Sequence, residues 1–313
     1  MKPTVARAAA LALALAATAC SKKAAEPASQ PAPVTPAPVA PVAPAPGTIA
    51  TPPAPAPPVG PGAPIPPDGL RFTIASPTVG AVETKSIERD TRMTFTLAPG
   101  QTSEVHGVER REERQEILEV DGGVATKIRI SYPTLTKEET GDGRPRRIPQ
   151  PPQAGKTYLV WRAGGTLTAS YEDGTTPPAP ELAAVTRDNL DVGRPQRLEE
   201  IMAEHAWQLG QPVDLTDAEL TRLNVNAAAD DKPAVTALRF TLQAVDAATA
   251  TFAMRMVLDQ RSSKGQVHVE LTGTAQVDRV TSQPVVIVGE GPMSGTIGAP
   301  VTGTMKMTSR YAR

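Results

Sequence analysis

The chain has 313 residues, a formal net charge of −1 and one cysteine. Seventeen of its 34 prolines lie between Pro27 and Pro67, which leaves residues 68–313, 246 in all, to build a core. This remainder is close to neutral, and only 3% of the chain is aromatic, so neither a basic surface nor stacking rings for nucleic acid are expected. The single cysteine excludes a disulfide framework and a cysteine-based zinc site.

The first residues have the pattern of a secretory signal. Met1–Arg7 carries Lys2 and Arg7 without an acidic residue, and Ala8–Ala19 is an unbroken run of Ala, Leu and one Thr. Twelve residues in a helix cover roughly 18 Å, which is too short for the ~30 Å hydrocarbon core of a bilayer. A charged start followed by a short apolar run is typical of a cleaved signal peptide, here residues 1–19.

The lone cysteine follows this run directly. Ala17-Thr18-Ala19-Cys20 resembles the lipobox of bacterial lipoproteins, although Ala17 stands where that family prefers Leu. The resemblance implies that the leader is removed and that Cys20 is acylated, which anchors the chain to a membrane. Because Ser21 rather than Asp follows, it also implies the periplasmic face of the outer membrane. The alternatives are an ordinary signal peptide with a free thiol, or a protein at the cell surface or secreted.

Residues 20–67 are predicted to be a Pro/Ala-rich tether. Prolines recur every two or three residues, and each one removes a backbone donor, so neither helix nor sheet is expected. Such a segment favours polyproline II and extends about 3.1 Å per residue. We interpret it as a stalk, or as a linker whose length is unimportant.

The start of the folded part is predicted to be rich in strands. Alternation of apolar and polar residues predicts strands at Leu70–Ser76 and Arg92–Ala98, and the charged Glu109–Glu116 is predicted to be a solvent-exposed strand whose charges pair across to a neighbour. Two hairpins are expected, and Glu138–Ala154 is expected to be a loop. The hairpin strands are Glu116–Val120 with Val124–Tyr132, and Thr157–Arg162 with Thr166–Tyr171.

The period changes to that of helices at about 180–226. Glu181–Asp188 follows Pro180, a second run extends from Leu198 to Leu209, and Thr216-Asp217-Ala218-Glu219 is a capping box. We predict two or three short amphipathic helices inserted here.

From Ala234 the alternation has period two again. Five runs joined mostly by short turns predict an antiparallel meander with one apolar face. Four methionines are predicted to share that face: Met254, Met256, Met305 and Met307. The whole fold is therefore predicted to be mainly β (α+β), a single domain over 68–313 with a curved antiparallel sheet or half-barrel and the helical insertion.

Little in the sequence points to catalysis. Gly155-Lys156-Thr157 lacks the earlier glycine of a phosphate-binding loop, and His106, His205 and His268 are too far apart for metal-ligand spacing. We therefore expect no catalytic residues, no metal and no cofactor, with a hydrolase kept as an unfavoured alternative. The methionines are adaptable and suit varied apolar partners, so their face is the candidate binding surface, although an ordinary core under the helices is the simpler interpretation.

The chain resembles a family of uncharacterised bacterial lipoproteins in the order of its segments. The resemblance rests on Ala17–Cys20, Gly155-Lys156-Thr157-Tyr158, Gly273–Val277 and Gly303–Tyr311, and it implies no known activity. The expected architecture is also similar, more distantly, to periplasmic lipoprotein-carrier half-barrels. We expect a binding module for an apolar ligand, a lipid or an envelope protein. The alternative is a structural envelope lipoprotein positioned by its tether.

Overall fold

The computed structural model describes residues 65–195, 197–224 and 233–313. The predicted signal peptide, Cys20 and nearly all of the tether lie outside the described residues. In the described part, long strands dominate and three short helices interrupt them, so the predicted fold class is confirmed. The strands are β1 (Val82–Ala98), β2 (Gln101–Asp121), β3 (Val124–Gly141), β4 (Arg144–Arg146), β5 (Thr157–Ala163), β6 (Thr166–Ser170), β7 (Pro212–Asp214), β8 (Pro233–Val245), β9 (Thr249–Ser262), β10 (Gly265–Asp278), β11 (Pro284–Ile297) and β12 (Pro300–Ala312). The helices are α3 (Ala179–Asp188), α4 (Arg197–Glu204) and α5 (Asp217–Asn224).

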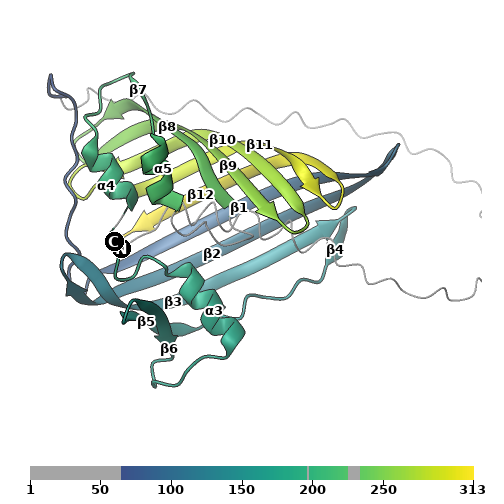
Figure 1. Cartoon of the computed structure of the whole chain (residues 1–313), viewed down its shortest axis with the longest axis horizontal. Helices are drawn as coiled ribbons and strands as arrows, with labels where there is room; N and C mark the ends of the chain where they lie inside the picture. Colours follow the sequence, from purple (N-terminus) through teal and green to yellow (C-terminus); the bar gives the residue numbers. More distant parts are fainter. Residues whose placement is uncertain (1–64, 196, 225–232) are drawn as a thin grey trace, which may run out of the picture.

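One curved antiparallel sheet contains all of these strands (Figure 1). The order is β6-β5-β3-β2-β1-β12-β11-β10-β9-β8-β7, and β4 pairs with β3 off this path. Strands β1 and β12, far apart in the chain, pair in the middle of the sheet, from Thr84 opposite Ala312 to Phe95 opposite Val301. We call this pairing the seam. It joins the meander β8–β12 to the strands β1–β6.

The predicted meander and hairpins are confirmed. Strands β8 to β12 pair consecutively, and the predicted hairpins are β2 with β3 and β5 with β6. The capping box of α5 also forms, since the backbone N–H of Thr216 donates to Glu219 Oε2 over 2.7 Å and that of Glu219 donates to Thr216 Oγ1 over 3.3 Å.

Three local predictions were wrong. Leu70–Ser76 is not a strand, because it pairs with the chain only at Leu70, which exchanges backbone hydrogen bonds with Trp207. That pairing also ends the second helical run early, so α4 stops at Glu204 instead of reaching Leu209. Glu138–Ala154 is a loop only in part, because β3 continues to Gly141 and turns back into β4.

Glycines allow neighbouring backbones to approach closely at β11 and β12. A Cβ on Gly291 would overlap the carbonyl oxygen of Glu270, and one on Gly303 would overlap that of Arg92. Backbones approach this closely only where a side chain is absent, and glycine kinks of this kind curve a sheet. One of these positions faces the methionine surface, since Gly291 is the register partner of Met305.

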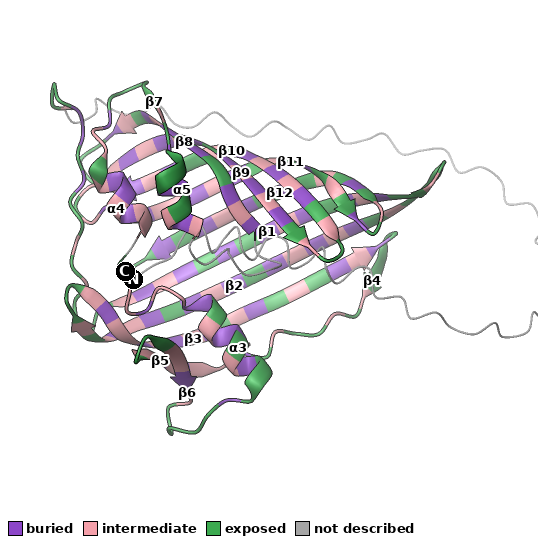
Figure 2. Cartoon of the chain, viewed as in Figure 1, coloured by how far each residue is buried: buried purple, intermediate pink, exposed green. Residues whose placement is uncertain are grey.

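Burial alternates along the long strands, so the sheet has one buried face and one exposed face (Figure 2). We call the buried face the inner face. Its apolar residues form two clusters: a large one across β8–β12 with α4, α5 and the ends of β1 and β2, and a smaller one between β3, β5, β6 and α3. The helices have their main contacts at the two ends of the sheet, α5 on β8, α4 on α5 and α3 on β6.

Candidate functional site

The four methionines occupy the inner face in two adjacent rows. One row crosses four neighbouring strands, β9 to β12, and consists of Met254, Gly273, Gly289 and Met307 in that order. In the next row Gly291 lies opposite Met305. All four methionine side chains are at most 3% exposed and belong to the large cluster. The predicted apolar face therefore exists as one continuous surface, and its role in binding stays a prediction.

The helical cover is concentrated at the β8 end of this surface. The indole of Trp207 packs edge-on against Phe240 and Phe252 and donates from Nε1 to the carbonyl of Met202 over 2.8 Å. The main contacts of α5 are with β8, one end of the strand order. The helices thus cap the margins of the inner face, and β12 and β1 lie in the middle of the sheet between them (Figure 1).

The inner face changes character at the seam. In the same row as Met307 lie Arg89 on β1, Glu109 on β2 and Lys137 on β3. Arg89 Nη1 lies 2.9 Å from Glu109 Oε2, and both side chains are fully buried. We call the inner-face charges of β1–β3 the ionic stripe, which comprises four cations and four carboxylates: Lys85, Arg89, Arg111, Lys137, Glu83, Glu109, Glu113 and Glu139. The predicted strand at Glu109–Glu116 is confirmed with its cross-strand pairing, but the prediction that it is solvent-exposed was wrong, since every second residue faces the inner side and is buried.

The charges of the ionic stripe have partners of opposite sign, and those of Glu83 and Glu139 are Arg313 and Arg146 outside it. Lys85 Nζ lies 3.7 Å from Glu113 Oε2, and Lys137 Nζ lies 3.8 Å from Glu109 Oε2. Burial lowers the pKa of Arg89 and of Lys137 below their ordinary values, and the facing Glu109 opposes that shift in each case. Burial also acts on Arg111, but Asp188 and Glu113 overcome it and raise its pKa. The stripe is therefore a balanced array of cations and anions in a poorly solvated place.

Among the buried side-chain atoms without a hydrogen-bond partner in the described part of the chain are Thr91 Oγ1 and Ser309 Oγ at the seam and Glu109 Oε1 on the adjacent strand β2. Thr91 lies opposite Met305, and Ser309 lies two residues after Met307 on β12. The three side chains are at most 1% exposed. An unsatisfied buried polar group costs about 1–3 kcal/mol, so a concentration of them beside the methionines calls for an explanation.

A second polar cluster fixes α3 to the sheet. The carboxylate of Glu181 accepts from Tyr158 over 2.6 Å and from Tyr171 over 2.5 Å, and it pairs with Lys156. Burial alone would raise the pKa of Glu181, but these three donors hold it below its ordinary value. Lys156, the residue that resembled part of a phosphate-binding loop, is thus engaged with a helix of its own chain.

Asp188 holds the other end of α3. Its Oδ2 accepts from Arg111 Nη2 over 2.8 Å and from Gln153 Nε2 over 3.1 Å, while Asn189 donates to the Tyr132 hydroxyl over 2.9 Å. These contacts give the cluster a structural role, because they connect the end of α3 to β2, to β3 and to the loop before β5.

Each histidine faces a carboxylate. His106 Nε2 lies 3.0 Å from Asp90, His205 Nε2 lies 2.6 Å from Glu219, and His268 Nδ1 lies 2.8 Å from Asp259. His205 connects the end of α4 to the capping box of α5. Within residues 65–195, 197–224 and 233–313, no group of three or more His, Cys, Asp or Glu side chains is arranged to hold a metal ion. Nor does any helix there have the length and apolarity needed to cross a membrane.

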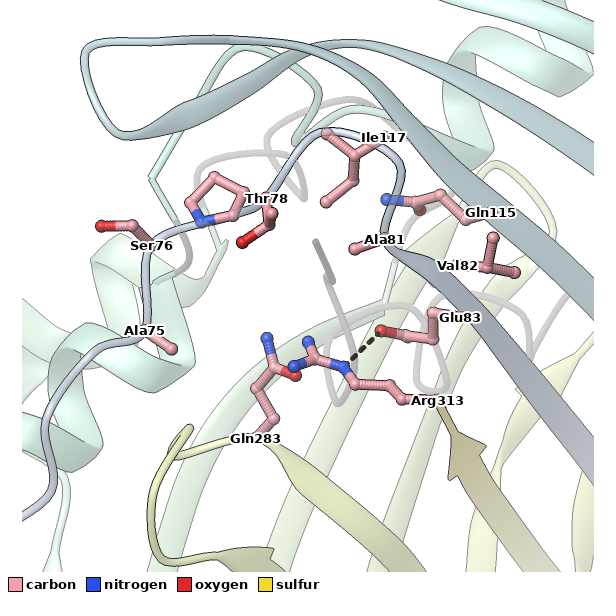
Figure 3. A pocket seen from close by; sticks show the side chains of 11 residues that line it. Ala75, Ser76, Thr78, Ala81, Val82, Glu83, Gln115, Ile117, Gln283 and Arg313 are labelled. Atoms are coloured by element: carbon pink, nitrogen blue, oxygen red, sulfur yellow. Dashed lines mark ion pairs between the residues drawn. The ribbon is translucent and has the colours of Figure 1, made fainter.

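A small cavity of about 70 Å³ lies where the segment Ala75–Thr78 passes the ends of β1 and β12 (Figure 3). Arg313 extends into it and pairs with Glu83 at 3.5 Å, and Gln115 and Gln283 add amide groups. Burial lowers the pKa of Arg313. The cavity has room for a few water molecules but not for an acyl chain.

Comparison with known proteins yields distant structural neighbours only. No protein-family model matches the chain, and no curated protein matches its sequence. A structure described as lipid-protein interactions in lipovitellin aligns with 75% of this chain at 5% identity and a TM-score of 0.38, and the chain spans 25% of that protein. An S-type phycobiliprotein lyase from Guillardia theta aligns with 75% of this chain at 9% identity and a TM-score of 0.21, and the alignment covers 89% of the lyase. Neither likeness is close enough to transfer a function.

Proposed function

We propose that the chain is a non-catalytic binding module for an apolar or amphiphilic ligand, held at the periplasmic face of the outer membrane by acylated Cys20. The observation that carries the binding role is the continuous apolar surface between Met254 and Met307, with helices whose main contacts lie at its margins. The proposed location at the outer membrane rests on the expected acylation of Cys20.

Methionine suits a surface that is closed without ligand and open with it. The side chain has three rotatable bonds and a polarizable sulfur, so it repacks at low cost around ligands of different shape. Between Met254 and Met307 the row holds only Gly273 and Gly289. The side chains of Met254 and Leu271 lie over Gly289, and a ligand chain that displaces Met254 would lie along this row.

The binding role is tested with the full chain extracted from membranes in mild detergent. Native mass spectrometry should show a co-purified lipid, and ¹³C-methyl labelling of methionine should show the Met305 and Met307 signals shifting when lipid is added. Met305→Leu and Met307→Leu keep the volume but stiffen the side chain, so each should weaken binding. Met202→Leu, a buried methionine of α4 outside the proposed surface, is the matched control. Absence of lipid together with unmoved methyl signals would refute the binding role.

The anchor is tested separately by Cys20→Ser. Loss of the thiol removes the acylation nucleophile, and stable membrane attachment needs more than one acyl chain. The variant should therefore appear in the soluble fraction when membranes are pelleted, while the wild-type chain stays with them. Continued membrane attachment of the variant would show that Cys20 is not the anchor.

A further inference from the structure

The seam places an apolar row and an ionic row next to each other on one face. Met305 and Met307 lie on β12, and their register partners on β1 are Thr91 and Arg89. A ligand that covers both strands would meet methylthio groups on one side and paired charges on the other. That arrangement matches an amphiphile lying across the seam, with its acyl chains over β9–β12 and its head group over β1 and β2.

The unsatisfied atoms indicate which hydrogen bonds the head group must make. Glu109 Oε1 is an acceptor and requires a donor, whereas the hydroxyls of Thr91 and Ser309 can donate and require acceptors. All three are at least nine-tenths buried. The head group must therefore carry N–H or O–H donors at one point and oxygen acceptors at another.

The charge balance narrows the choice further. Near the seam Arg89 is paired with Glu109, Lys85 with Glu113 and Lys137 again with Glu109, and the whole ionic stripe holds four cations and four carboxylates. A ligand with a net charge would unbalance this poorly solvated array, because a bare anion would lie close to Glu109 and a bare cation close to Arg89. A zwitterion adds no net charge and presents one group of each sign.

From this geometry, and resting on the proposed function, we propose that the seam binds a zwitterionic aminophospholipid. Its primary ammonium donates to Glu109 Oε1, its phosphate or ester oxygens accept from the hydroxyls of Thr91 and Ser309, and its acyl chains lie against Met305 and Met307. Binding is non-covalent, and no bond of the lipid is broken.

Four lipids with identical acyl chains separate the requirements. Phosphatidylethanolamine has the ammonium donors and no net charge, phosphatidylcholine lacks the N–H groups, phosphatidylglycerol is anionic, and diacylglycerol has a hydroxyl but no phosphate. We would titrate each into the full chain in detergent and measure binding by native mass spectrometry. Phosphatidylethanolamine should bind about ten-fold more tightly than the other three, the effect of a single charge-assisted hydrogen bond.

Two substitutions test the residues. Thr91→Val and Ser309→Ala remove the hydroxyls with little change in size, and each should weaken phosphatidylethanolamine binding several-fold. Thr94→Val, on the same strand but the opposite face, is the control and should leave binding unchanged. Equal affinity for all four lipids, a preference for one of the other three, or unchanged binding in both hydroxyl variants would overturn the aminophospholipid site while leaving lipid binding intact. No binding of any lipid would overturn the proposed function itself.

Discussion

Replacing Tyr158 by Phe tests whether the Glu181 cluster holds α3 on the sheet. The Tyr158 ring is fully buried and its hydroxyl donates to Glu181 Oε1 over 2.6 Å, so the substitution removes one hydrogen bond and keeps the packing. Hydrogen bonds to a charged group contribute about 1.5–3 kcal/mol. Because the same oxygen still accepts from Tyr171, we expect the lower part of that range, about 2 kcal/mol.

Urea denaturation followed by far-UV circular dichroism measures this loss as a lower midpoint at unchanged slope. For a domain of this size the melting temperature should fall by roughly 4–8 °C. Lys156→Met is the matched comparison. It removes a partner of the same carboxylate, but the lysine side chain is 42% exposed, so solvent screening limits the cost to less than about 1 kcal/mol. A Tyr158→Phe variant no less stable than Lys156→Met would refute the reasoning.

The remaining predictions concern the charges of the sheet. Arg89→Met leaves Glu109 buried without its 2.9 Å partner and should lower the free energy of unfolding, measured by urea denaturation, by about 3–5 kcal/mol. Adding Glu109→Leu should restore most of that stability, because the unpaired buried charge is then gone. If the losses of the two substitutions instead add in the double variant, this account is contradicted. The pKa of His268 is raised, chiefly by its hydrogen bond to Asp259, so its contribution to stability is full at acidic pH and is lost as pH rises through that pKa. The stability difference between wild type and His268→Gln should therefore shrink from about pH 6 to pH 9; a constant difference would exclude a titrating pair.

The C-terminal meander could be predicted from the sequence because its inner face is apolar. Every second residue of β9, such as Phe252, Met254 and Met256, is hydrophobic, and short turns join the strands. Period-two hydrophobicity is the main sequence signal of a strand with one buried face, so the four methionines could be placed on one face in advance.

The N-terminal strands were harder to predict because their inner face is ionic. In β1 the inner positions include Lys85, Arg89 and Thr91, so hydrophobicity has no period two there, and only the end of the strand, with Met93 and Phe95, was predicted. In β2 the inner positions Glu109, Arg111 and Glu113 alternate in sign, which is a usable signal for paired charges on one strand face. Nothing in the sequence indicated that β1 and β12 pair, since that contact joins residues more than 200 positions apart.

The extended segment near Leu70 shows a second way in which prediction of strands from sequence fails. Leu70 and Phe72 are buried, and their alternation with exposed residues is that of a strand. The side chains of the segment instead pack into the large cluster, where Phe72 lies against Phe252, and its strand pairing is limited to the bridge with Trp207. Alternation reports which side chains are buried, but it does not report whether a neighbouring backbone is available for pairing.

The pairing of the first and last strands of the described sheet also affects the order in which the protein assembles. The meander β8–β12 and the strands β1–β6 can each form from neighbouring hairpins, whereas β1 and β12 meet only after the whole chain is available. Such long-range pairing is slow, and until it forms the two strands present unpaired edges. A ligand bridging Met307 and Arg89 would bind only the completed sheet and would stabilise it by mass action. Bound lipid would then keep the seam closed, and the rate at which the seam reopens should fall as the lipid concentration rises.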